Sequence, residues 1–204
     1  MNSLTTYPDV SRETCERLEI YAGLLRKWNP KINLVSATTL ADLWTRHMED
    51  SAQVLAAAPK TGDTWYDLGS GGGFPGLVCA ILAQELRPTL QITCVESDLR
   101  KVSFLRTVIR ETGLTSQVLA KRVEAIAPAN ADILSARALA PLGNLLAFAS
   151  MHLKPSGTAL FPKGVRYQSE LDDAQSSWRF SVEEINSTTG QGSVILRIGD
   201  IERV

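Results

Sequence analysis

The spacing of hydrophobic residues changes about sixty residues into the chain. Before that point apolar residues recur every three or four positions, as on one face of a helix. They predict a helix over residues 11–28, which the Asn29-Pro30 step should end because a residue before proline disfavours helical backbone. A second helical pattern covers residues 39–58. Residues 1–58 are therefore expected to form a helical extension packed on the rest of the chain.

After residue 59, short apolar runs that predict strands alternate with helical patterns. The runs lie at 64–69, 90–96, 116–121, 131–136 and 157–162, and the helices at 75–86, 99–113 and 142–153. Two further strand patterns, 178–185 and 193–201, flank a polar turn that predicts a hairpin. Such alternation predicts an α/β fold whose mostly parallel sheet is covered by helices on both faces. We expect seven strands, with an antiparallel C-terminal hairpin, in one domain over residues 59–204.

Composition adds only broad limits. The 204 residues are 44% hydrophobic and 21% charged, which is ordinary for a globular chain. Three scattered cysteines without metal-ligand spacing suit a reducing compartment, and the start lacks the pattern of a signal peptide. The longest apolar run, at 77–83, is too short to span a bilayer. We expect a cytoplasmic protein without a membrane segment or a bound metal.

The stretch DLGSGGGFPG, from Asp67 to Gly76, follows the first predicted strand and contains five glycines. Ligands of open α/β sheets bind at the carboxyl ends of the strands, and glycine lets backbone N–H groups approach them closely. Gly71-x-Gly73-x-x-Gly76 matches the dinucleotide fingerprint. Asp67-x-Gly69-x-Gly71-x-Gly73 resembles the loop of S-adenosylmethionine-dependent methyltransferases instead.

Two carboxylates bear on this choice of cofactor. Glu96 closes the second predicted strand, where an acid can accept both ribose hydroxyls of either cofactor. Asp67 adds negative charge that disfavours a pyrophosphate and suits the sulfonium and ammonium groups of S-adenosylmethionine. An alternative is that Asp67 shapes the loop by accepting backbone N–H groups. Both interpretations of Asp67 disfavour a nicotinamide dinucleotide.

Four segments extend the resemblance over residues 21–164. They read YAGLLRKWNPKINLVS with RHMEDS, DLGSGGGFPGLVCAI, ESDLRKVSFLR, and RALAPLGNLL with FPKG downstream. Through them the chain resembles the bacterial 16S rRNA guanine-N7 methyltransferases, the rRNA small-subunit methyltransferase G family, also called glucose-inhibited division protein B. The resemblance implies a Rossmann-like methyltransferase fold that uses S-adenosylmethionine. The implied substrate is N7 of guanine 527, in the 530 loop of 16S rRNA or of the small ribosomal subunit.

The motif and the resemblance together nominate a set of cofactor-binding residues. They are Asp67, Gly69, Gly71, Gly73, Phe74, Glu96, Val123, Glu124 and Arg137. Within this set, the resemblance implies that Val123 and Glu124 flank the adenine. Arg137 matches the remaining arginine of the family's site and is expected to contact the cofactor or the guanine. Lys163, before Gly164, is a second candidate for positioning guanine or RNA.

The chemistry of guanine N7 agrees with the residues available. Its lone pair can accept a methyl group without losing a proton, so the reaction requires in-line alignment and no general base. The chain has two histidines, His47 and His152, and no Asp/Asn-Pro-Pro-Tyr loop after the fourth predicted strand. His47 is expected to be structural. Arg137 and Lys163 are therefore expected to position substrate and to transfer no proton.

The sequence is also compatible with other functions. A net charge of −1 gives no general indication of nucleic acid and suits a small-molecule methyltransferase on the same fold. Between residues 87 and 122, however, seven basic residues stand against three acidic ones. A non-catalytic regulator that binds S-adenosylmethionine is a third possibility, and a nicotinamide oxidoreductase a distant fourth. We expect a monomer.

Overall fold

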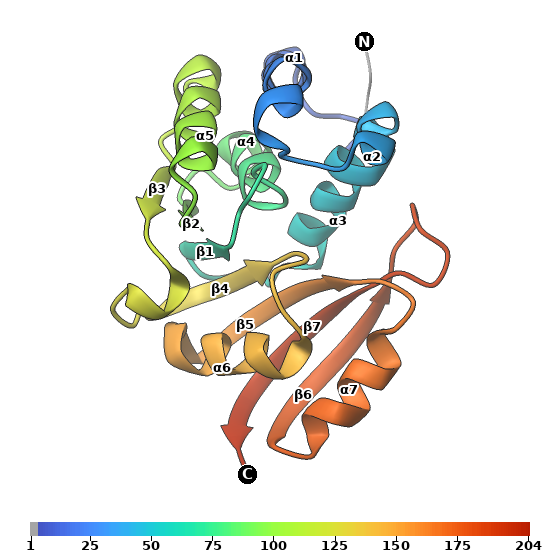
Figure 1. Ribbon diagram of the computed structural model, residues 1–204, viewed down its shortest axis with the longest axis vertical. Helices are drawn as coiled ribbons and strands as arrows, with labels where there is room; N and C mark the ends of the chain where they lie inside the picture. The colour runs from blue at the N-terminus through green and yellow to red at the C-terminus, as the bar shows by residue number, and fades with distance from the viewer. Residues whose placement is uncertain (1–3) are drawn as a thin grey trace.

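The computed structural model describes residues 4–204 and places a seven-stranded sheet between two layers of helices (Figure 1). The strand order is β3-β2-β1-β4-β5-β7-β6, with β1 to β5 parallel and β7 antiparallel to both of its neighbours. The strands are β1 (Thr64–Leu68), β2 (Gln91–Glu96), β3 (Gln117–Ala120), β4 (Ala131–Ala136), β5 (Leu153–Lys163), β6 (Trp178–Asn186) and β7 (Val194–Arg203). The predicted sheet and its C-terminal hairpin are confirmed.

The helices cover the two faces unequally (Figure 1). The N-terminal helices, α4 and α5 lie on one face, and α6 and α7 lie on the other. Their bounds are α1 (Arg12–Ile32), α2 (Ala37–Ala41), α3 (Asp50–Ala57), α4 (Gly76–Leu86), α5 (Leu99–Thr112), α6 (Leu142–His152) and α7 (Tyr167–Gln175). A π-helix, η1 (Trp44–Glu49), precedes α3, and a short 3-10 helix, η2 (Val123–Ala125), follows β3.

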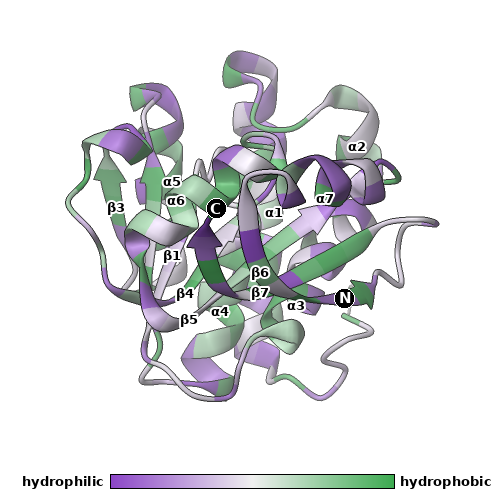
Figure 2. Ribbon diagram, turned by 90° about the horizontal axis from the view of Figure 1, so that it is seen from below, coloured by the Kyte–Doolittle hydropathy of each residue, from purple (hydrophilic) through white to green (hydrophobic). Residues whose placement is uncertain are grey.

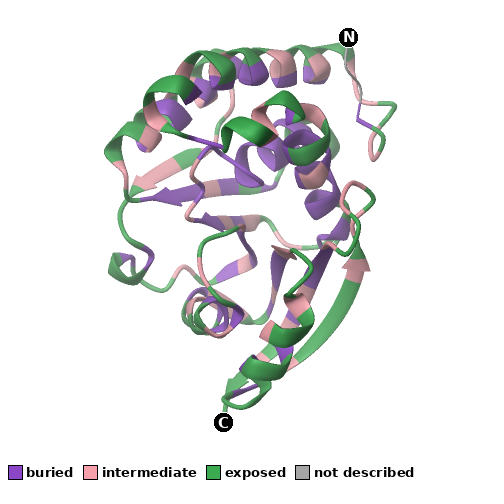
Figure 3. Cartoon of the chain, turned by 45° about the vertical axis from the view of Figure 1, so that its right-hand side comes forward, coloured by how far each residue is buried: buried purple, intermediate pink, exposed green. Residues whose placement is uncertain are grey.

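Alternating side chains of the strands build two hydrophobic cores. Trp65 of β1 and Ile133 of β4 point to the face that carries the N-terminal helices. Leu68 and Leu134, on the same two strands, pack against α6 on the other face. This two-residue period is the geometry of a pleated sheet. Buried strands between helices with exposed outer surfaces are visible in Figure 3.

Helix α1 continues past the point where the sequence predicted its end. It includes Pro30 and stops at Ile32, so the predicted stop at Asn29-Pro30 is wrong. Pro30 lies in the last turn of the helix, and its nitrogen has no hydrogen to donate to the preceding turn. Asn29 then accepts the backbone N–H groups of residues 34 and 35, and Asn33 adopts the left-handed conformation that closes the helix.

The single helix predicted over residues 39–58 is also wrong, because three shorter segments occupy this region. Asp42 leaves helical geometry after α2, and η1 then adds a wider turn before α3. A sequence period does not distinguish these wide turns from α-helix. Glu49, the last residue of η1, accepts the N–H groups of Thr5 and Thr6 at 2.8 Å each. The bend therefore turns a carboxylate toward the start of the described chain.

The C-terminal third contains a helix that the sequence analysis did not predict. In α7 only Leu171 and Ala174 are buried, which leaves too weak an apolar pattern to detect. Figure 2 shows α7 as largely hydrophilic, and β6 is exposed over most of its length in Figure 3. Strand β5 also begins at Leu153, earlier than predicted.

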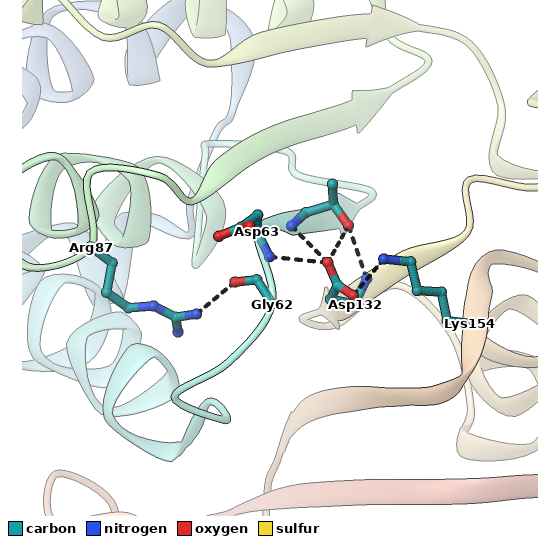
Figure 4. Close-up of polar contacts among 6 residues, drawn as sticks. Gly62, Asp63, Arg87, Asp132 and Lys154 are labelled. Atoms are coloured by element: carbon teal, nitrogen blue, oxygen red, sulfur yellow. Dashed lines mark hydrogen bonds and ion pairs between the residues drawn. The ribbon is translucent and has the colours of Figure 1, made fainter.

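A polar cluster closes the amino ends of β1 and β4 (Figure 4). The Asp132 carboxylate accepts the N–H groups of Asp63 and Thr64, at 3.0 and 3.1 Å, and the Thr64 hydroxyl at 2.8 Å. Lys154 forms an ion pair with the same carboxylate at 2.6 Å. Arg87 donates to carbonyl oxygens of the loop before β1. These contacts fix the end of the sheet that lies opposite the glycine loop.

Candidate functional site

A cavity of about 750 Å³ opens at the carboxyl ends of the central strands. It is lined by the glycine loop after β1, the loop after β4, the N-terminal helices, the end of β5 and the hairpin between β6 and β7. The predicted site residues that line it are Gly69, Gly71, Phe74, Arg137 and Lys163. Open α/β sheets bind ligands at this end, and the volume lies within the range of small-molecule sites.

The glycine loop needs its glycines for two separate reasons. Gly69, Gly71 and Gly73 have φ values of 63°, 56° and 93°, in the left-handed region that favours glycine. A Cβ on Gly69 would lie 2.5 Å from the side chain of Leu139, and one on Gly73 would collide with the hydroxyl of Tyr21. Gly69 and Gly71 therefore face the cavity, whereas Gly73 packs on α1.

Asp67 lies beneath this loop and is completely buried. Its carboxylate accepts the Ser135 hydroxyl at 2.6 Å and the Gly76 N–H at 3.3 Å, at the start of α4. Burial raises the pKa of Asp67 to about 6, although hydrogen bonds from Ser135 and Ser70 oppose the shift. A Cβ on Gly76 would lie 2.6 Å from the carboxylate. These contacts match the loop-shaping interpretation of Asp67.

Glu96 ties the same loop to the neighbouring strand. One carboxylate oxygen accepts the N–H of Gly71 at 2.9 Å, and the other accepts the N–H of Asp98 at 2.8 Å. Each oxygen keeps a further lone pair that can accept a hydrogen bond. Glu96 can thus support the loop and still receive a hydroxyl from a ligand.

Arg137 lies in a stack of side chains that the sequence analysis did not foresee. Its guanidinium carbon lies 5.1 Å from the centre of the Phe74 ring, and Nη2 lies 2.8 Å from Nδ1 of His47. Phe74 in turn stacks on Tyr21 of α1, with ring centres 5.2 Å apart. The Tyr21 hydroxyl donates to the carbonyl of Gly72. Helix α1 and η1 therefore hold the residues predicted from the two strand ends.

The hairpin between β6 and β7 completes the rim of the cavity. The Thr189 hydroxyl donates to the carboxylate of Asp50, and the N–H of Thr188 donates to Gln53 at 2.8 Å. Arg46 reaches the carbonyl of Thr189 at 3.5 Å. Burial raises the pKa of Asp50. Because 139 residues separate Asp50 from Thr189, no local pattern could have paired them.

Lys163 faces the cavity with its charge already paired. Its ammonium group lies 2.7 Å from a carboxylate oxygen of Glu170 and 3.3 Å from the carbonyl of Ala140. The same oxygen of Glu170 accepts the N–H of Leu142 at 2.9 Å. Helix α7, which was not predicted, thus supplies the partner of a predicted site residue.

Val123 and Glu124 lie in η2 and outside the lining of this cavity. Val123 is buried against α6, and the side chain of Glu124 is exposed. Their predicted contact with adenine depends on a ligand extending past Glu96 toward β3.

Comparison of the sequence with known proteins identifies the family of the chain. The model described as rRNA small subunit methyltransferase G matches residues 14–195. The chain belongs to this family. It is 58% identical over 196 residues to ribosomal RNA small subunit methyltransferase G of Ruegeria pomeroyi, covering 96% of each chain. It is 50% identical over 190 residues to the protein of the same name from Paracoccus denitrificans, covering 93% of this chain and 96% of that one.

Solved structures with little sequence similarity share the fold. A methyltransferase of Aquifex aeolicus that depends on S-adenosylmethionine superposes with a TM-score of 0.59 at 15% identity, covering 77% of this chain and 92% of that one. A ribosomal protein L11 methylase of Lactobacillus delbrueckii gives 0.58 at 16% identity, covering 76% and 78%. The Rossmann-like methyltransferase fold is therefore confirmed.

Family membership also confirms the predicted enzyme class, an rRNA methyltransferase, and S-adenosylmethionine as its cofactor. This disagrees with the nicotinamide oxidoreductase alternative. The cavity fits the cofactor: Gly69 and Gly71 expose backbone without Cβ atoms, and the start of α4 lies behind the loop. Within residues 4–204, no helix is long and apolar enough to cross a membrane.

Proposed function

We propose that the protein methylates N7 of guanine 527 in the 530 loop of 16S rRNA, by direct in-line transfer without a general base. When bound, S-adenosylmethionine supplies an electrophilic methyl group on its sulfonium. Guanine N7 offers a lone pair and no proton, so the protein has only to orient the base and exclude water. Extrusion of the base from its stack brings it into the cavity.

One observation carries the base-free mechanism. Every imidazole and carboxylate that lines the cavity within residues 4–204 is already engaged by a neighbour. His47 contacts Thr39 and Arg137 through its two ring nitrogens. Asp50 accepts the Thr189 hydroxyl, and Glu170 is paired with Lys163. A site organised in this way favours binding and orientation over proton removal.

The cofactor half of the cavity lies around the glycine loop. Gly69, Gly71 and Phe74 are proposed to contact S-adenosylmethionine directly, because all three line the cavity. Glu96 is proposed to accept the ribose hydroxyls with the lone pairs that Gly71 and Asp98 leave free. Asp67 and Gly73 would act through the shape of the loop, since both lie beneath it. Val123 and Glu124 are proposed to flank the adenine.

The substrate half is proposed to lie between Arg137 and Lys163. Arg137 has guanidinium N–H groups beyond those held by His47 and Arg46, and these can donate to guanine O6 or to the cofactor carboxylate. Lys163 is proposed to bind an RNA phosphate. To do so, its ammonium group would leave the ion pair with Glu170 and pair with the phosphate instead.

We further propose a cytoplasmic monomer that acts on 16S rRNA or the small ribosomal subunit. Residues 1–58 and 59–204 are proposed to work as one unit. A single buried cluster supports this, because it joins Leu18 and Leu25 of α1 to Trp65 of β1 and Leu160 of β5.

The function is tested with labelled S-adenosylmethionine and small subunits that lack 7-methylguanosine. We expect label in 16S rRNA and strand scission by aniline at guanine 527. Label at another nucleotide would contradict the proposed position. Absence of label in RNA, under conditions where calorimetry shows cofactor binding, would contradict rRNA methylation. Label in small molecules of a cell extract freed of RNA would favour the small-molecule alternative.

A further inference from the structure

The imidazole of His47 is held on three sides although no step of the proposed reaction uses it. It is 7% exposed and lies in the π-helix η1, against the ring of Phe74 with centres 4.8 Å apart. Nε2 lies 2.9 Å from the hydroxyl of Thr39, and Nδ1 lies 2.8 Å from Nη2 of Arg137. The ring thus joins the N-terminal helices to the arginine that faces the cavity.

The partner on each nitrogen determines where the proton resides. A guanidinium can only donate, so Nδ1 must accept from Arg137 and the ring proton must be on Nε2. The hydroxyl of Thr39 can accept a hydrogen bond from this Nε2–H while it donates its own hydrogen to the carbonyl of Ser36, 3.1 Å away. The imidazole is therefore neutral and in one tautomer. Burial and the positive charges of Arg137 and Arg46 agree, because they lower the pKa of His47 to about 3.

The same contacts leave one side of Arg137 free. Nη2 is held by His47, Nη1 lies 3.4 Å from the carbonyl of Arg46, and the face of the guanidinium rests on Phe74. Its remaining N–H groups can be directed at a ligand. Of the two hydrogen bonds that Arg137 makes within residues 4–204, the one to His47 is the shorter, so it is the tighter constraint on where those groups point.

We propose that His47 is a positioning residue: as a neutral hydrogen-bond acceptor it orients the guanidinium of Arg137 toward the substrate in the cavity. The inference rests on the proposed function of the site, and it deepens that function by assigning a role to a residue that transfers no proton. The π-helix is consistent with it, since such wide turns are frequent at functional sites. The backbone carbonyl of His47 also accepts the Ser51 hydroxyl, which fixes the turn below the ring.

The tautomer can be measured without substrate or cofactor. Proton–nitrogen correlation spectra of the histidine rings distinguish Nε2–H from Nδ1–H, and only two histidines need assignment. We expect the Nε2–H tautomer for His47 in the wild type, with the assignment made from the spectrum of His47→Asn. In Arg137→Leu, where the donor is lost, the Nδ1–H form should become detectable. An Nδ1–H tautomer in the wild type would overturn the proposal.

Two substitutions separate the two nitrogens. In His47→Asn the amide oxygen can occupy the position of Nδ1 and accept from Arg137, while the contact to Thr39 is lost. In His47→Gln the longer side chain can reach Thr39 but presents no atom at the Nδ1 position. We expect kcat/KM for rRNA to fall about 10-fold or more in the Gln variant and by less than about threefold in the Asn variant. Cofactor affinity and melting temperature should depend on the contact to Thr39 and on packing. They should therefore not rank the two variants in the same order as kcat/KM does.

The order of kcat/KM in His47→Asn and His47→Gln distinguishes a positioning role from a purely structural one. Equal losses in both, or losses that parallel their melting temperatures, would show that His47 has only a structural role. The nucleotide that is labelled does not enter this ranking, so wild-type methylation at another base would contradict the proposed function and leave the positioning role testable. If the wild type labels no RNA at all, the tautomer spectra still test the contact between His47 and Arg137.

Discussion

The two ends of strand β1 can be compared directly, because at each end one aspartate links it to β4. At the amino end, Asp132 accepts two N–H groups, a hydroxyl and the ammonium group of Lys154 (Figure 4). Lys154 and the other donors hold its pKa well below the usual range. At the carboxyl end, Asp67 accepts Ser135 and Gly76 in complete burial, and its pKa is raised to about 6.

The difference shows how one strand can serve stability at one end and the proposed cofactor site at the other. Around Asp132 the charge is matched at the edge of the protein, where solvent also reaches it, so it stabilises the native state. Around Asp67 the native state holds a carboxylate in surroundings that disfavour its charge. The buried acid instead supports a loop whose left-handed glycines face a cavity. Substitutions at the two ends should therefore affect different measurements.

Replacing Arg137 should give the largest effect. Arg137→Leu removes a charged donor from the cavity, and we expect methyl transfer to rRNA to fall by about 100-fold. The unfolding free energy should fall as well, because Arg137 contacts His47, Phe74 and the carbonyl of Arg46, so transfer is compared per folded molecule. The matched control is Arg87→Leu at the amino end, where the arginine donates to the carbonyls of Pro59 and Gly62. That variant should unfold at lower temperature and keep its activity per folded molecule.

Glu96→Ala should weaken cofactor binding by about 10- to 100-fold, since charge-assisted hydrogen bonds contribute roughly 1.5–3 kcal/mol each. The loss combines the proposed ribose contact with the support that Glu96 gives to Gly71. Calorimetry with S-adenosylmethionine measures it. Glu96→Gln keeps the shape and one acceptor, so its affinity should lie between wild type and Ala. Unchanged affinity in the Ala variant would contradict the assignment of Glu96 to the ribose.

Asp132→Asn should lower the unfolding free energy by about 2 kcal/mol at pH 7, because several donors lose a charged acceptor. The pKa of Asp132 is lower in the folded state, so this contribution is complete above the unfolded pKa of about 3.9 and is lost progressively as the pH falls from there toward the depressed folded pKa, which makes it smaller at pH 3 than at pH 7. Denaturation with urea at pH 7 and pH 3 tests both statements. Lys154→Met, which removes only a partly exposed ion pair, should cost less than about 1 kcal/mol. Reduced cofactor affinity in either variant would contradict the separation of the two ends.

Lys163→Ala should have the smallest effect, because Glu170 already balances its charge. We expect RNA binding to weaken a few-fold and the slope of affinity against salt to fall by up to about one unit. Filter binding over a range of salt concentrations measures both. Glu170→Gln releases the ammonium group and should strengthen RNA binding. A salt slope that stays the same in Lys163→Ala would place this lysine outside the RNA footprint.

Much of the scaffold could be predicted because its information is local. Buried strands such as residues 64–69 can be recognised in the sequence as short apolar runs. The glycine loop places the end of a strand, glycines for unusual backbone and the start of a helix within ten residues. The family resemblance rested on the same local segments. Its prediction of Arg137 as a site residue agrees with the lining of the cavity.

The contacts around that scaffold could not be predicted, because they join distant segments. His47 and Arg137 are 90 residues apart, and no periodicity relates them. The π-helix η1 was hidden in a helical pattern, since wide and regular turns bury similar faces. Helix α7 was hidden for the opposite reason, because only two of its residues are buried. Its Glu170 nevertheless determines the charge that Lys163 can offer.

The hydrogen bond between Asp50 and Thr189 has a consequence for how the chain folds during its synthesis. The ribosome adds Thr189 to the chain 139 residues after Asp50. Tyr21 likewise donates to the carbonyl of Gly72, which is made 51 residues later. A nascent chain can therefore assemble the central strands, yet its cavity lacks a wall until the last hairpin leaves the exit tunnel. The cavity of this rRNA methyltransferase is therefore completed only after the segment that contains Thr189 has been made.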